Sequence, residues 1–389
     1  MSNHRVAILV PPETPDAPAD QADTFRQARE IHQCLTILGK ESLTVVHDGD
    51  GDGTDRALLE AAPAVVVNLV EDLPEGPQFA FRVAERLDRL GIPYTGAKTA
   101  ALRALGDKRE MKRRLREAGL PVADDLEASA SAARATSPHP LPRRERVHRG
   151  TASPFLPRGG EVGPVGPGGG ALPQLQSVAS DAPPERYIIK SAVEHASIGL
   201  DDTSVVQGRA AAEGLLARRR ATGGAWFAEH YIDGREFNVA ILETGDGPQV
   251  LPVAEILFLA HADRPRILGY AEKWAEDSSA YAATPRRFAT DPTDAPLLGA
   301  LARLALAAWR AFDLTGYARV DFRVDAAGRP YILEVNANPC LAANAGFCAA
   351  ASEAGMAQTD VVAHLIETAR VRTDPLAPDR RAGRPPEDF

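Results

Sequence analysis

The 389-residue chain is 44% hydrophobic and 25% charged, which is ordinary for a globular protein of two or three domains. Its net charge of −9 argues against nucleic acid as a main partner, because neutralising phosphates requires concentrated lysine and arginine. Three scattered cysteines, Cys34, Cys340 and Cys348, are too few for a disulfide framework or a zinc site. Without a recognisable leader or an apolar run of about 18 residues, we expect a cytoplasmic protein with no membrane partner.

The first 98 residues alternate between strand and helix patterns. Arg5–Val10 is a short apolar run typical of a buried strand, and a helical spacing from Phe25 to Leu38 follows and ends at Gly39. Further strands are predicted at Leu43–His47 and Ala64–Leu69, with a helix between them and another around Phe79–Leu90. This alternation predicts a doubly wound α/β domain over residues 1–98, with helices on both faces of a parallel sheet.

Residues 99–240 are predicted to form a small α+β lid with an insertion. Asp107–Ala118 indicates a basic helix, and 15 of the 34 residues from 137 to 170 are Pro or Gly, with five Arg. Such a segment cannot bury enough surface to offset its ordering entropy, so we predict a disordered insertion over residues 135–183, with a basic docking segment as the alternative. Strands are expected at Arg186–Lys190, Trp226–Tyr231 and Arg235–Leu242.

Residues 241–372 are predicted to form a C-terminal α+β domain. A strand is expected at Pro248–Phe258, an Ala- and Leu-rich helix at Leu297–Phe312 and a last helix at Asp360–Val371. The Pro- and Arg-rich residues 373–389 are predicted to be a loose tail.

Residues Gly316–Leu341 predict a β-hairpin that carries chemistry. A four-residue loop, Ala326–Arg329, would place Asp325 opposite Pro330, Asp321 opposite Glu334 and Arg319 opposite Asn336. The period of two puts these polar residues on one face. The other face would be a core surface, formed by Val320, Phe322, Val324, Tyr331, Leu333 and Val335.

Two carboxylates directly opposite on a sheet repel, which normally destabilises the pairing. A divalent cation between them would make the arrangement favourable, and oxygen ligands from Asp321, Glu334 and the Asn336 amide suit Mg²⁺ or Mn²⁺. The alternative is a solvated polar face. The accompanying Arg319 and the Pro339 turn favour the metal site over that alternative.

This hairpin, with Arg319-Val-Asp321 followed by Leu-Glu334-Val-Asn336-Ala-Asn338-Pro339, closely resembles the metal-binding end of the D-alanine–D-alanine ligases. These enzymes belong to the ATP-grasp superfamily. The resemblance covers most of the chain outside the insertion. It implies an ATP-grasp architecture made of α/β and α+β parts: the N-terminal α/β domain, the lid and the C-terminal domain.

The resemblance also implies an ATP site. Lys108 and Lys190 resemble the family's two ATP lysines, and Glu194-His195-Ala196-Ser197-Ile198-Gly199 resembles its phosphate loop, in which Glu194 and Ser197 are candidate contacts. Glu229 and Ile232 match the segment that meets adenine, Glu236 matches the acid that holds the ribose hydroxyls, and Lys273 matches the central-domain lysine. Without the resemblance, the ordinary interpretation of each lysine is a surface residue and that of each glutamate an exposed strand residue. Lys190 differs in ending an apolar strand, where an unpaired charge is costly.

The part that would bind the substrates departs from the ligases. Glu13 does not align clearly with the glutamate that holds the first D-alanine amine, and Ala196 replaces a serine. Cys340 replaces a glycine in a substrate loop made of Asn338, Pro339, Cys340 and Leu341. A covalent role for Cys340 is the weaker interpretation, because acyl phosphate chemistry needs no thiol.

The resemblance implies an ATP-dependent ligase that joins a small-molecule carboxylate to an amine through an acyl phosphate, with Arg319 and Lys273 as catalytic residues. A ligase for another amino acid, a peptide or a biosynthetic carboxylate is at least as well supported as D-alanyl-D-alanine synthesis. A non-catalytic ATP-binding protein is a further alternative, and a homodimer is one assembly that the resemblance allows. An oxidoreductase is disfavoured, because Pro11-Pro12-Glu13 follows the first strand where a Gly-x-Gly-x-x-Gly turn would be needed.

Overall fold

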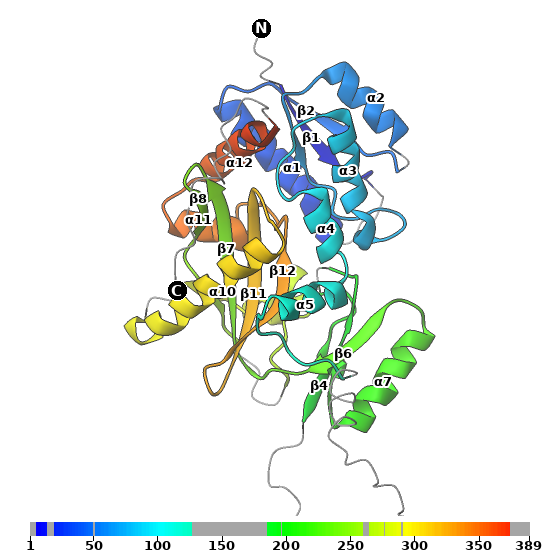
Figure 1. Cartoon of the computed structure of the whole chain (residues 1–389), viewed down its shortest axis with the longest axis vertical. Helices are drawn as coiled ribbons and strands as arrows, with labels where there is room; N and C mark the ends of the chain where they lie inside the picture. The colour runs from blue at the N-terminus through cyan, green and yellow to red at the C-terminus, as the bar shows by residue number, and fades with distance from the viewer. Residues whose placement is uncertain are drawn as a thin grey trace, which may run out of the picture.

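The computed structural model describes residues 5–13, 19–49, 51–126, 185–195, 197–259, 264–275, 277–288 and 291–373. The predicted insertion at 135–183 and the predicted tail, apart from residue 373, lie largely or wholly outside these ranges. Three bodies follow one another along the long axis of the molecule. An N-terminal α/β body lies at the top of Figure 1, a larger sheet with its helices lies in the middle, and a small lid lies below.

The N-terminal body is the predicted parallel sheet, with β1 in the centre. Its described strands run in the order β2-β1-β3, and all are parallel. Side chains of β1 alternate between two cores, because Ile8 packs with α1 and α12 while Leu9 packs with α2 and α3. The elements are β1 (Val6–Val10), α1 (Ala19–Ile37), β2 (Ser42–Val46), α2 (Asp52–Ala61), β3 (Val65–Asn68), a 3₁₀ turn (Pro77–Phe79) and α3 (Phe81–Leu90). Helices on both faces confirm the doubly wound prediction.

The middle body is built on one antiparallel sheet, whose strands differ in length. Among the described residues its strands run in the order β10-β9-β7-β11-β12, and β8 also pairs with β7. The strands are β7 (Gly234–Thr244), β8 (Gly247–Val250), β9 (Ala254–Ile256), β10 (Arg286–Phe288), β11 (Tyr317–Asp325) and β12 (Pro330–Asn336).

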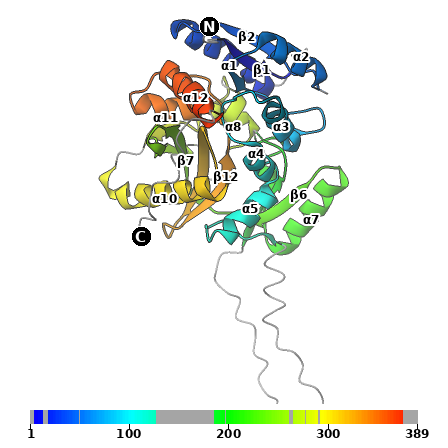
Figure 2. The ribbon, with the colours of Figure 1, turned by 45° about the horizontal axis from the view of Figure 1, so that its top comes forward.

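Helices cover both faces of this sheet. One face packs against α4 (Thr99–Leu105), α5 (Lys108–Glu117) and α10 (Ala295–Ala311). The other packs against α11 (Gly346–Glu353) and α12 (Gln358–Thr373), and the same core continues into β1 and α1. The last helix therefore joins the C-terminal part of the chain to the N-terminal body, as Figures 1 and 2 show.

The lid is a separate small sheet with its own core. In the described part of the chain β4 (Arg186–Ser191) lies between β5 (Val205–Gln207) and β6 (Trp226–His230), and all pairings are antiparallel. Tyr187, Ile189 and Leu216 fill the space between this sheet and α7 (Arg209–Ala221). Residues 234–240, which the sequence analysis assigns to the lid, lie in β7 of the middle sheet instead.

Two predicted strands differ from the structure. Pro248–Phe258 is two strands, β8 and β9, because Pro252 has no N–H to donate and the chain moves there from one end of β7 to the other. In the hairpin the predicted pairs Asp321–Glu334 and Arg319–Asn336 are confirmed, but Pro330 lies opposite Val324 rather than Asp325. A bulge after Asp321 compensates for this shift of one residue.

The bulge changes which side chains of β12 face the core. Ile332 is 2% exposed in the core, although the alternation predicted Tyr331 and Leu333 there. Leu333 instead lines the pocket described below. The remaining short elements are 3₁₀ turns at Asp202–Ser204 and Pro292–Asp294 and the helices α8 (Tyr270–Trp274) and α9 (Ser279–Ala282).

Candidate active site

A pocket opens between the lid sheet and the β11–β12 hairpin. It brings together side chains from β4, β6, the start of α5, α8 and the hairpin, segments far apart in the sequence. Every residue predicted to contact ATP lines it, together with Lys273 and both metal-site carboxylates. These residues are Lys108, Lys190, Glu194, Ser197, Glu229, Ile232, Glu236, Lys273, Asp321 and Glu334.

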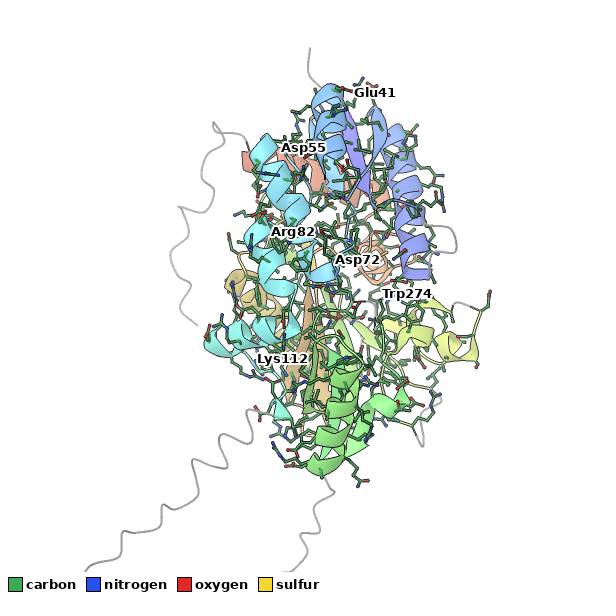
Figure 3. All side chains as sticks on the ribbon, turned by 90° about the vertical axis from the view of Figure 1, so that its right-hand side faces the viewer. Glu41, Asp55, Asp72, Arg82, Lys112 and Trp274 are labelled. Atoms are coloured by element: carbon green, nitrogen blue, oxygen red, sulfur yellow. The ribbon has the colours of Figure 1, made fainter. Side chains whose placement is uncertain are left out.

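Glu229 on β6 lies between two lysines at the lid end of the pocket. Lys190 Nζ on β4 is 2.5 Å from Glu229 Oε1, and Lys112 on α5 donates to the other carboxylate oxygen and to Asp125. Burial alone would raise the pKa of Glu229, but the two lysines outweigh it and hold that pKa at about 2. Figure 3 labels Lys112 where α5 meets the lid. The carboxylate is therefore a fixed negative charge that positions Lys190.

Lys112 is a residue that the sequence analysis missed. It is 1% exposed, although it lies in a helix rich in exposed charges. Its position four residues after Lys108 places both lysines on one helix face, which is the signal that could have indicated it. Burial of a lysine is tolerated here because Asp125 and Glu229 supply opposite charges.

Apolar side chains and one acid form the inner part of the pocket. Glu236 on β7 is buried, and its Oε2 is 3.0 Å from Arg323 Nη2. This ion pair keeps a carboxylate at the edge of an otherwise apolar cavity, which suits a flat base and a ribose. The apolar lining residues are Ile188, Ile198, Leu200, Ile232, Ile267, Leu268 and Leu333.

The loop after β4 lies at the other end of the pocket. Lys108 Nζ donates to the Glu194 carbonyl, and Ser197 Oγ donates to the Leu268 carbonyl at 2.7 Å. Ser197 has a φ of +63°, an uncommon value for a non-glycine residue that turns the loop sharply. Burial and the Lys108 charge lower the pKa of His195 to about 4, so its imidazole is neutral at pH 7. Ala196 lies outside the described residues.

The two hairpin carboxylates are held by different cations. Arg319 donates Nε and Nη2 to Asp321 at 2.7 and 2.9 Å, and Asn336 and Asn238 also donate to Asp321, at 3.0 and 2.8 Å. Glu334 Oε1 lies 3.3 Å from Lys108 Nζ. Burial would raise the pKa of Glu334, yet Lys108 and Lys273 lower it to about 2. Both acids therefore offer negatively charged oxygens on one face of the hairpin.

This donor set fits a hard divalent cation. Within the described ranges no group of three or more His, Cys, Asp and Glu side chains is placed to hold a metal, and the predicted set holds only two such residues. Its third member is the Asn336 amide. Mg²⁺ commonly takes one or two carboxylates and completes its shell with phosphate and water, so two acids and an amide beside this lysine-lined pocket fit its needs.

The predicted substrate loop is fixed onto α1 and the N-terminal body. Cys340 Sγ donates to Asp23 Oδ2 at 2.9 Å, and the Leu341 and Ala343 N–H groups donate to Gln27 and Glu30, each at 2.8 Å. The three α1 residues have the spacing of one helix face.

The members of this loop differ in what they contact. Asn338 Oδ1 accepts the Ala97 N–H at 3.0 Å, and Leu341, at 1% exposed, is a core residue. Burial and the neighbouring Asp23 raise the pKa of Cys340, so its thiol is neutral and a poor nucleophile. Of the four predicted loop residues, Cys340 contacts α1 through its side chain and Leu341 through its backbone N–H. Glu13 is exposed at the end of a described range.

Comparison with known proteins gives the class of this fold and site. Residues 185–367 match the family described as "D-ala D-ala ligase C-terminus". The D-alanine–D-alanine ligase of Bacillus anthracis complexed with ATP superposes with a TM-score of 0.61 at 17% identity, covering 95% of this chain and 98% of that one. The corresponding ligase of Coxiella burnetii gives a TM-score of 0.58 at 14% identity, with 95% and 96% covered.

Sequence relatives agree with the fold. The D-alanine–D-alanine ligase of Janthinobacterium sp. (strain Marseille) is 25% identical over 75% of each chain. An uncharacterised protein, y4sG of Sinorhizobium fredii, is 25% identical over 89% of this chain and 88% of its own. The chain therefore has the ATP-grasp fold. Within that class, residues 185–367 belong to the family of the D-alanine–D-alanine ligase C-terminal domain, and the chain as a whole is similar to D-alanine–D-alanine ligases.

The described residues contain no helix long and apolar enough to cross a bilayer.

Proposed function

We propose that the protein uses Mg-ATP to join a small-molecule carboxylate to an amine through an acyl phosphate. One observation carries the proposal: the pocket gathers three lysines, one acid suited to adenosine and two acids suited to a metal around one cavity. A protein that only binds the nucleotide would not need Arg319, Asp321, Glu334 and Asn336 together at the phosphate end.

The residues divide into three groups along the pocket. Glu236 and the apolar side chains would hold adenosine, and Lys108 and Lys190 would neutralise the inner phosphates. Asp321, Glu334 and Asn336 would hold Mg²⁺, which supplies charge neutralisation on phosphate oxygens when bound. Burial lowers the pKa of Lys273, with Glu334 acting in the opposite direction. Lys273 lines the pocket beside Glu334 and would neutralise the outer phosphate.

The proposed reaction has two steps. A substrate carboxylate oxygen attacks the γ-phosphorus, the bond from that phosphorus to the β–γ bridging oxygen breaks, and ADP leaves. The amine then attacks the acyl carbon, the carbon–oxygen bond to phosphate breaks, and the amine nitrogen gives up a proton as the amide forms. Arg319 is half-buried and held in one orientation by Asp321, and it would stabilise the negative charge of both transition states.

Phosphate release by the purified full chain tests this proposal. The protein is incubated with Mg-ATP and pools of D- and L-amino acids and dipeptides, and products are identified by mass spectrometry. ADP and phosphate released together with a new amide are expected. ATP binding without turnover on any pool would favour the non-catalytic alternative, and AMP with pyrophosphate would contradict the acyl phosphate.

The same experiment identifies the carboxylate. D-alanine alone as a sufficient substrate would mean that Cys340 and the altered loop are tolerated variation. A different product would support a ligase for another amino acid, a peptide or a biosynthetic carboxylate, the alternative that the departures at Cys340 and Glu13 favour.

A further inference from the structure

One arginine of α7 contacts both the strand and the loop that line the lid side of the pocket. α7 packs against β4 and β6 of the lid (Figure 1). From this helix, Arg219 Nη1 donates to the carbonyls of Ile189 and Gly199, each at 3.1 Å. Ile189 precedes Lys190 in β4, and Gly199 lines the pocket at the far end of the loop after β4. A single guanidinium therefore joins the strand that carries Lys190 to that loop.

The ring of Trp226 holds the same glycine. Arg219 Cζ lies 4.7 Å from the ring centroid, and a methyl group placed on Gly199 would lie 3.0 Å from the ring carbon Cη2. Trp226 Nε1 donates to the Gly223 carbonyl at 2.9 Å, which fixes the orientation of the ring. Gly199 has a φ of +72°, in the left-handed region that favours glycine. The loop end is thus held by a hydrogen bond to its carbonyl and by close packing on the indole.

The guanidinium is directed at neutral acceptors. The Arg219 side chain is 15% exposed, and its Nη2 donates to Ser204 Oγ at 2.8 Å, whereas Asp201 Oδ1 lies 3.8 Å away, beyond hydrogen-bond distance. β5 pairs with β4 as far as Ile188, so the Ile189 carbonyl that accepts from Arg219 is the first one beyond that pairing. Because the N–H donors of arginine lie in one rigid plane, they can fix several acceptors in a single geometry.

The near end of the loop is held by a residue of the proposed site itself. Lys108 Nζ donates to the Glu194 carbonyl and lies 3.3 Å from Glu334 Oε1. A phosphate of ATP would compete for the same ammonium, and this anchor would then weaken. Arg219 does not line the pocket, so its contacts with the loop would be kept when a nucleotide binds.

We propose that Arg219 is a positioning residue that holds the loop after β4 in the conformation that receives the outer phosphates of ATP. The inference rests on the proposed function, because it assigns the phosphates to the end of the pocket where Lys108 meets Glu334. Arg219 acts through Ile189 and Gly199 and does not touch the nucleotide. Its loss should therefore weaken contacts with phosphate and leave the contacts with adenosine in place.

The test compares two ligands of the full-length protein that differ in their phosphates. Affinities for Mg-ATP and for adenosine are measured by calorimetry. Arg219→Met, which removes the hydrogen bonds and keeps an apolar stem, should weaken ATP binding by about tenfold to a hundredfold and adenosine binding by less than about twofold. The kcat for ATP turnover should fall by as much as about 100-fold, the cost of misplacing reacting groups by about 1 Å.

Two further variants separate positioning from general damage to the lid. Arg218→Met changes the adjacent exposed arginine of α7 and should match the wild type. Arg219→Lys keeps the charge and loses the paired donors, so it should show the same selective loss of ATP affinity to a smaller degree, even if Arg219→Met does not fold. Equal weakening of ATP and adenosine binding in the Arg219 variants would overturn the inference, as would wild-type affinity and kcat. Absence of ATP binding by the wild type would instead contradict the proposed function itself.

Discussion

Glu334 lies directly opposite Asp321 across the β11–β12 hairpin, yet Lys108 holds the first acid and Arg319 the second. Each cation belongs to the proposed reaction centre, so the two acids are held by groups that would also act on the substrates. In this arrangement both carboxylates would share one divalent cation when Mg-ATP binds.

Removing one of these acids should weaken metal-dependent turnover. Loss of a residue that merely supports a metal ligand costs about tenfold to a hundredfold, and loss of a ligand should cost no less. Glu334→Gln is therefore expected to raise the Mg²⁺ concentration required for half-maximal ATP turnover by at least that factor. Asp325→Asn, at the turn of the same hairpin, serves as the control and should titrate like the wild type. An unchanged Mg²⁺ requirement in Glu334→Gln would remove Glu334 from the metal site.

Lys190 should contribute to nucleotide affinity. In the ligand-free pocket it pairs with Glu229 at 2.5 Å, and an ATP phosphate would compete for the same ammonium. Lys190→Met should weaken ATP binding, measured by calorimetry, by about tenfold to a hundredfold. Lys98→Met, an exposed lysine paired with Asp313, is the matched control and should bind ATP normally. Equal affinities for the two variants would show that Lys190 does not reach the nucleotide.

The stability contributed by Glu229 should depend on pH. Its folded pKa of about 2 lies below the ordinary value of 4.5, so its stabilisation is complete above pH 4.5 and is lost as pH falls toward 2. Glu229→Gln leaves Lys112 short of a buried partner and should cost about 3–5 kcal/mol of unfolding free energy at neutral pH.

Urea titrations of wild type and Glu229→Gln from neutral to acid pH check this. The gap between their unfolding free energies should narrow as pH falls and approach zero once Glu229 is protonated. A difference in unfolding free energy that stays constant across this pH range would mean that the charge of Glu229 does not stabilise its contacts with Lys112 and Lys190.

Arg319 is expected to affect the rate of the chemical steps more than the affinity for ATP. Its bidentate contact with Asp321 fixes the guanidinium outside the adenosine part of the pocket, so it would act on charge that develops in the transition states. Arg319→Ala should lower kcat by about 100- to 1,000-fold, the cost of losing one such donor, with little change in the Kd for ATP. A variant with full turnover, or one whose only defect is ATP affinity, would contradict this role.

Much of the nucleotide end could be predicted from the sequence because its residues lie in local patterns. The hairpin alternation places Asp321 opposite Glu334. Lys190 follows an apolar run within a strand, and this position predicts a functional lysine because an unpaired charge there would be costly. The position of Leu333 in the pocket, rather than in the core, could not be predicted, because it depends on a bulge that alternation alone does not reveal.

The substrate end depends on contacts between distant segments. Asp23, Gln27 and Glu30 hold a loop more than 300 residues away in the sequence, and the exposed Arg286 comes near Arg319 only in three dimensions. Lys112 likewise looks like one more charge of a basic helix until β6 brings Glu229 against it. Tertiary contacts of this kind leave no periodic signal in one sequence.

The most direct test of the central claim is the fate of the substrate carboxylate oxygen. Once an amide product is found, its donor is prepared with heavy oxygen in the carboxylate, and the released phosphate is analysed by mass spectrometry. Direct attack of that carboxylate on the γ-phosphate predicts that one labelled oxygen leaves with each phosphate, because the oxygen that bridges carbon and phosphorus departs with the phosphate. Unlabelled phosphate, or label recovered in AMP, would contradict an acyl phosphate and with it the role assigned to this pocket.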